Sequence, residues 1–159
     1  MRIETTQVIH GPAYRSDHRY EVVVMKLDIE ALENLPTNLI SGFDERLVFL
    51  MPSLMECHCP DGDSSGFLAR VRGGTLIVNV VEHLAQELQC LAGMHWGYGR
   101  TLSTSRRGVY YVVFASGHEA AGIYAAHAAV RIAEELVAGA TYVVADDVTT
   151  LRAMVRDAY

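Results

Sequence analysis

The chain has 159 residues, of which 50% are hydrophobic and 20% charged, and its formal net charge is −6. A chain of this length folds as one domain that buries about 70% of the surface its unfolded form exposes, without disulfides or a structural metal. The acidic balance excludes an ordinary nucleic-acid-binding module, and the apolar runs fall short of the roughly 20 residues that span a bilayer. Three cysteines, an odd number, and no basic-then-apolar leader predict a reducing cytoplasm.

Two strands are predicted near the start of the chain, at residues 3–9 and 21–29. Both are rich in β-branched residues, and in the second Val23, Met25, Leu27 and Ile29 alternate onto one face. The residues between them, 11–19, mix turn formers with polar and cationic side chains, which indicates an exposed connection.

Short helices are predicted next, at residues 29–33, 43–50 and 67–71. The loop before the last of them contains Cys57, His58 and Cys59. A structural zinc site needs four ligands, commonly two pairs, and the chain has no second cysteine pair. We interpret these cysteines as ordinary reduced thiols.

A long helix is predicted at residues 75–91, and Gly93 closes it. It is apolar over most of its circumference, but one line of polar residues interrupts the apolar surface: Asn79, Glu82, His83 and Gln86. Their spacing of i, i+3, i+4 and i+7 puts them on one face. That face is either the solvated side of the helix or the floor of a cleft where a carboxylate and an imidazole address one ligand.

The same residues nearly match a metallohydrolase signature, H-x-x-E-H. In that pattern the two histidines bind zinc and the glutamate acts as general base on the bound water. Here Asn79 replaces the first histidine, while Glu82 and His83 keep the base and one ligand. A neutral amide oxygen is a poor zinc ligand compared with imidazole.

The second half of the chain predicts strands at residues 95–103 and 108–114, joined by a hairpin at 104–107. On the first of them, Trp96, Tyr98 and Arg100 offer aromatic faces and a forked donor to a ligand, or form a packed sheet edge. Gly97 and Gly99 begin a dinucleotide fingerprint that lacks its third glycine.

Two further helices complete the pattern. Residues 120–137 form an alanine-rich helix expected to pack on the sheet through Ile123, Val130 and Val137, and Asp146 or Asp147 is predicted to cap a last helix that continues to the end of the chain. The element order predicts a single α+β domain, with a four-stranded, largely antiparallel sheet packed against helices. A chain that ends inside a helical pattern suggests part of a longer protein.

Segments throughout the chain resemble the N-terminal domain of cyanophycin synthetases. The segments that carry the resemblance are His10-Gly11-Pro12, Val24-Met25-Lys26-Leu27-Asp28, Pro52-Ser53-Leu54, Gly66-Phe67-Leu68-Ala69-Arg70-Val71, Val81-Glu82-His83-Leu84-Ala85-Gln86-Glu87-Leu88-Gln89, Leu91-Ala92-Gly93-Met94, Gly97-Tyr98-Gly99-Arg100-Thr101, Gly108-Val109-Tyr110 and Ala128-Ala129-Val130-Arg131. They occur in order over nearly all of residues 1–159.

The resemblance implies a module of a cytoplasmic, homo-oligomeric ligase that builds an aspartate backbone carrying arginine on each side-chain carboxylate. The ligase uses ATP and magnesium in its other domains, so no cofactor is expected in this chain. The implied partners are cyanophycin itself and those other domains. In this family the N-terminal domain holds the polymer, and in many members it also cuts polymer into primers at a metal site.

The family pattern has histidine at positions 79 and 83, glutamate at 82, and Glu-His at 56 and 57. This chain keeps Glu56, Glu82 and His83, whereas Asn79 and Cys57 depart from it. The two departures predict a degenerate site that lacks zinc and retains Glu82 as a vestigial base.

The residues expected to bind the polymer are Arg70, Asn79, Gln86, Trp96, Tyr98 and Arg100. Two alternatives stay open. One is an active zinc hydrolase in which Cys57, Glu56 or Glu119 replaces the missing histidine, and the other is a purely structural assembly module.

Overall fold

Four strands form one antiparallel sheet in the computed structural model, which describes residues 1–10, 21–56, 66–94 and 98–156. The strands are β1 (Arg2–His10), β2 (Glu21–Asp28), β3 (Gly99–Ser103) and β4 (Val109–Ser116), in the spatial order β1-β2-β4-β3. All three pairings are antiparallel, so the predicted α+β fold is confirmed. The strand β3 lies at one edge of the sheet.

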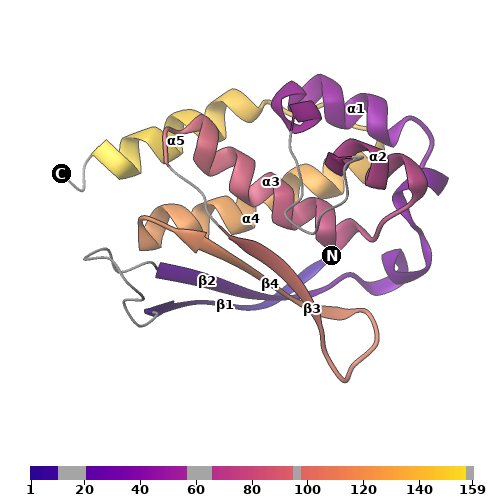
Figure 1. Ribbon diagram of the computed structural model, residues 1–159, viewed down its shortest axis with the longest axis horizontal. Coiled ribbons are helices and arrows are strands. Elements are labelled where there is room, and N and C mark those ends of the chain that lie inside the picture. Colours follow the sequence, from indigo (N-terminus) through magenta and orange to yellow (C-terminus); the bar gives the residue numbers. More distant parts are fainter. Residues whose placement is uncertain (11–20, 57–65, 95–97, 157–159) are drawn as a thin grey trace.

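The helices of the described residues pack on one face of this sheet (Figure 1). They are α1 (Phe43–Leu50), α2 (Gly66–Gly73), α3 (Ile77–Leu91), α4 (Glu119–Ala138) and α5 (Val144–Arg156), together with 3₁₀ turns at Glu30–Asn34, Thr37–Leu39 and Pro52–Glu56. The helix α3 lies against β3 and β4, and α4 lies nearer β1 and β2. None of these helices is both long enough and apolar enough to span a membrane.

The core lies between the sheet and the helices. The alternating residues Val23, Met25, Leu27 and Ile29 are fully buried, as their period of two predicts. Partners from α3 include Val81, Leu84 and Leu88, which are also fully buried.

The packing of α4 differs from the expectation. Its buried face is formed by alanines with Val130, Ile132 and Leu136, whereas Ile123 and Val137 are only partly buried. Alanines let the helix backbone approach the sheet closely, and this moves the contact face away from the larger side chains at 123 and 137.

The start of the last helix is also corrected. The helix α5 begins at Val144, so Asp146 and Asp147 lie inside its first turn and neither is the cap. Asp147 is 4% exposed and accepts hydrogen bonds from the Tyr124 hydroxyl (2.8 Å), the Tyr142 hydroxyl (2.8 Å) and the Arg131 guanidinium (3.0 Å). This carboxylate therefore joins α5 to α4, while Asp146 is exposed.

Candidate functional site

The polar line of α3 is covered by protein. Glu82 and Gln86 are 6% and 8% exposed, and Asn79 and His83 are partly buried. The solvated-face interpretation is therefore wrong for this helix. The edge strand β3 lies over the polar line, and the helix remains fully packed on its apolar sides.

The close approach of β3 depends on Gly99. A Cβ atom at this position would overlap the side-chain amide of Gln86 and the carboxylate of Glu82. Gly99 pairs with buried Phe114, so it faces the helices. The second glycine of the incomplete dinucleotide pattern thus lets a strand backbone cover two polar side chains.

The Glu82 carboxylate is held by its two helical neighbours. Gln86 Nε2 donates to Glu82 Oε1, and His83 Nδ1 lies 3.2 Å from Glu82 Oε2. The other amide atom of Gln86, Oε1, is buried and accepts no hydrogen bond from the described residues. A buried acceptor without a donor is costly, so it is a point where a ligand donor would be stabilised.

The imidazole of His83 is fixed in orientation. Its Nδ1 lies 2.9 Å from the carbonyl oxygen of Asn79, one turn earlier. The Phe67 ring of α2 stacks on it, with 3.8 Å between ring centroids and 8° between planes. The helix α2 therefore packs beside the polar line and forms part of the same site.

The side chain of Asn79 bridges α3 to two threonines. Its Nδ2 donates to Thr75 Oγ1 at 2.8 Å, and Thr101 Oγ1 donates to its Oδ1 at 2.6 Å. Thr101 is on β3 and pairs with buried Val112, which places it on the helix side of the sheet. The amide therefore links the edge strand to α3.

The strand β3 separates the predicted binding residues into two groups. Arg100 pairs with Val113 and points away from the helices, and Tyr98, just before the strand, is 49% exposed. Asn79 and Gln86 lie beneath the strand. Because β3 is an edge strand, the two groups meet only around its free edge.

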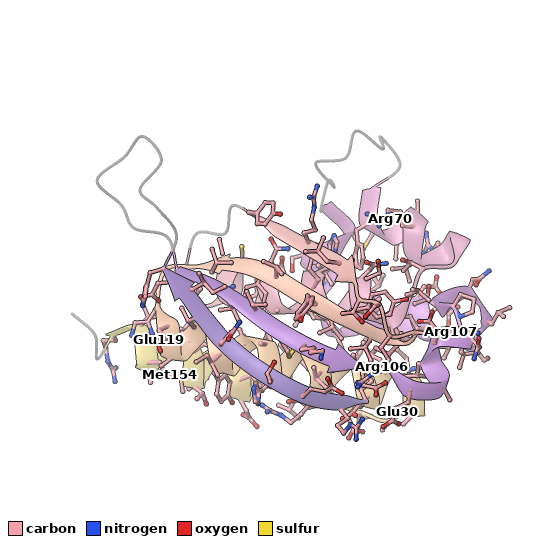
Figure 2. The ribbon with its side chains drawn as sticks, turned by 90° about the horizontal axis from the view of Figure 1, so that it is seen from below. Glu30, Arg70, Arg106, Arg107, Glu119 and Met154 are labelled. Carbon is pink, nitrogen blue, oxygen red and sulfur yellow. The ribbon has the colours of Figure 1, made fainter. Side chains whose placement is uncertain are left out.

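Arg70 is placed on α2, three residues after Phe67. In Figure 2 its side chain lies toward the β3 side of the molecule, whereas Glu119 lies at the far end. Cys57 and Trp96 fall outside the described residues, and for Glu56 the structure gives only its place at the end of the turn Pro52–Glu56.

The described residues do not supply a zinc site. Over residues 1–10, 21–56, 66–94 and 98–156, no three His, Cys, Asp or Glu side chains come together as metal ligands. Glu119 is therefore not assembled with Glu82 and His83. Protein zinc sites use three or four such ligands, so the described set does not fit the ion.

Sequence reasoning missed Thr75, Phe67 and Thr101. The strand alternation offered one usable signal, because Thr101 shares the parity of Gly99 and must face the same way. The stacking of Phe67 on His83 carries no such signal.

Comparison with known proteins identifies the family. Residues 23–138 match the family model described as the cyanophycin synthase-like N-terminal domain. The chain belongs to this family. The domain is 46% identical over 161 residues to cyanophycin synthetase from Trichormus variabilis, covering 99% of this chain and 18% of that protein. The synthetase from Synechocystis sp. is 49% identical over 137 residues, covering 86% of this chain and 16% of that protein.

The domain thus spans less than a fifth of the length of these curated relatives. The family match includes the strands β2, β3 and β4 and the polar line of α3, since the matched residues run from β2 to the end of α4.

Proposed function

We propose that this domain holds cyanophycin for a cyanophycin synthetase and does not cut it. The observation that carries the proposal is the bridge made by Asn79 within a domain of this family. The amide that replaces the expected histidine is hydrogen-bonded at both ends, to Thr75 and Thr101. It therefore supports the packing of β3 on α3, and the described residues near it offer only Glu82 and His83 as metal ligands.

Polymer holding is supported by the charges around the edge strand. Cyanophycin carries a guanidinium and a carboxylate in each repeat. Arg100 is exposed and forms no ion pair with the residues described, so its forked guanidinium can donate two hydrogen bonds to a polymer carboxylate. The exposed ring of Tyr98 suits a guanidinium.

Beneath the strand, Gln86 Oε1 and the Glu82 carboxylate are acceptors that β3 buries, so they would bind a polymer guanidinium only when the free edge of β3 moves away from α3. We assign Arg70, Gln86, Trp96, Tyr98 and Arg100 to binding, Asn79 to the bridge that holds β3 on α3, and no general-base role to Glu82. ATP-dependent ligation is assigned to the other domains of the synthetase.

The experiment is retention of the 159-residue domain on immobilised cyanophycin. We expect Arg100→Ala to lower retention and Arg152→Ala, the same charge change on α5, to leave it unchanged. Raising the ionic strength from about 0.01 M to about 1 M shortens the Debye length from about 30 Å to about 3 Å, so retention should fall. If Arg100→Ala and Glu82→Gln both retain polymer as the parent does, the polymer binds elsewhere.

A further inference from the structure

The face of the sheet opposite the helices is not covered by any described element (Figure 1). Cross-strand pairing arranges its side chains in rows. One row contains Ile9 and Val22, the next contains Val24 and Val113, and the third contains Tyr111 and Leu102. We call these six residues the outer patch.

The outer patch is apolar at its centre and exposed at its margins. Ile9, Leu102 and Tyr111 are 48%, 44% and 37% exposed, while Val22, Val24 and Val113 are partly buried by their neighbours. Two cations border the patch on this face: Arg100 ends the second row beside Val113, and Lys26 lies in the third row between Thr5 and Tyr111, where it pairs with Glu4 at 3.1 Å. Large contiguous apolar patches on a protein surface mark interaction sites.

The sequence of the central strands fits a sheet covered on both faces. An antiparallel strand with one wet face alternates apolar and polar residues. In β2, residues 22–25 read Val-Val-Val-Met, and in β4, residues 112–115 read Val-Val-Phe-Ala, so both faces are apolar there. Such continuous runs are typical of strands buried on both sides.

The chemistry of the outer patch excludes the polymer as its occupant. Each cyanophycin repeat brings two charges, and the centre of the patch offers no polar partner for them, so burying them there would be costly. The domain aligns with only 18% of the Trichormus variabilis synthetase, which leaves a large part of such an enzyme to cover an apolar face.

We propose that the outer patch docks onto a complementary apolar surface of another domain of the same synthetase polypeptide. This inference rests on the proposed function, because it takes the chain to be one module of that enzyme. Interfaces between domains of one chain have a buried apolar centre and a polar rim, as this face does. Docking would leave the free edge of β3 at the rim, beside Tyr98 and Arg100.

Hydroxyl-radical footprinting of the intact synthetase and of the isolated domain tests the proposal. The domain is suited to isolation because its own core is fully buried between sheet and helices. We expect modification of Ile9, Leu102 and Tyr111 to fall several-fold in the intact enzyme. Phe49, which is 87% exposed on α1, is the internal control and should react equally in both. Equal modification of the three patch residues in both proteins would overturn the inference.

A variant separates docking from polymer holding. Ile9→Lys with Tyr111→Lys in the intact synthetase should restore modification of Leu102 to the level of the isolated domain, and Phe49→Lys should not. Retention of the isolated double variant on cyanophycin should equal that of the parent. If the outer patch is protected in the intact synthetase but the parent domain is not retained on cyanophycin, the proposed function is refuted and the docking inference stands. Concentration-dependent protection in the isolated domain would instead identify a second copy as the occupant and overturn the inference.

Discussion

The hydroxyl of Thr101 donates to the side-chain oxygen of Asn79 across 2.6 Å, and this contact ties the edge strand β3 to the first residue of the polar line of α3. The two residues are 22 positions apart. Thr75 accepts from the other end of the same amide. Three uncharged side chains thus hold the edge strand on α3.

Thr101→Val should lower the free energy of unfolding by about 1–2 kcal/mol. The change keeps the shape of the side chain but removes the donor and leaves the Asn79 oxygen unpaired in a partly buried place. Chemical denaturation measures the effect. Ser103→Ala, on the exposed end of the same strand, is the matched control and should change stability little. Equal effects of the two variants would show that the bridge contributes nothing.

Gly99→Ala should destabilise the domain by about 1–3 kcal/mol, because the added methyl overlaps the Gln86 amide and the Glu82 carboxylate. Gly117→Ala is the control, since a Cβ at Gly117 meets no atom within 4 Å. Adding Gln86→Ala to Gly99→Ala should recover part of the loss, since neighbouring changes are not additive. If the Gly99→Ala domain were as stable as the parent, β3 would not pack closely against Gln86 and Glu82.

The strands and helices themselves were largely predictable. Period-two alternation identified β2, and the hairpin between β3 and β4 followed from turn residues near 104–107. The order of the strands in the sheet was not predictable, because it depends on which edges the connections allow to meet. The helix start at Val144 was also missed. Asp147 resembles a cap in the sequence, but its carboxylate accepts hydrogen bonds from Tyr142, 5 positions away, and from Tyr124, 23 positions away.

The residues of the candidate site could be predicted from their spacing, but their burial beneath β3 could not. Spacing put Asn79, Glu82, His83 and Gln86 on one face, which the structure bears out. Whether water or protein covers that face depends on β3, which follows the helix in sequence. The hydrophobic pattern of the helix does not predict where this strand packs. Arg100 was likewise correctly placed on β3, but its outward direction follows only from its register with Val113.

Asp147→Asn should cost about 2–4 kcal/mol of stability, while Asp146→Asn should be near neutral. The first change weakens hydrogen bonds from two tyrosines and an arginine to a buried carboxylate, and the neighbouring carboxylate is exposed. Thermal and chemical unfolding of the pair of variants measures the difference. Equal stability of the two variants would contradict the role of Asp147 in joining α5 to α4.

Acidification should destabilise the domain through His127. Burial and, to a smaller extent, Arg131 lower the pKa of this imidazole in the folded state. The unfolded chain therefore binds a proton at a higher pH than the folded domain, and stability falls as pH drops below the ordinary histidine value of about 6.5. His127→Gln should flatten the dependence between about pH 7 and 5. An unchanged slope in His127→Gln would remove this residue as the cause.

Replacing Asn79, which bridges Thr75 and Thr101, by a metal-binding histidine should lower stability and raise zinc affinity. Asn79→His breaks the hydrogen bonds to Thr75 and Thr101, so without metal it should lower stability by about 1–2 kcal/mol. Together with Cys57→His it should raise zinc affinity, because two imidazoles then join His83. Zinc titration followed by calorimetry and by thermal shift measures both effects. A double variant whose zinc affinity equals that of the parent would contradict the degenerate-site interpretation.

The most direct test incubates the parent domain with cyanophycin and zinc and measures, in one sample, the retained domain and the length of the polymer. We expect the parent domain to stay on the polymer, and we expect the polymer length to stay unchanged with or without zinc, for the parent and for Glu82→Gln alike. Zinc-dependent shortening of the polymer that Glu82→Gln abolishes would contradict the account, as would a domain that washes off the polymer at low ionic strength.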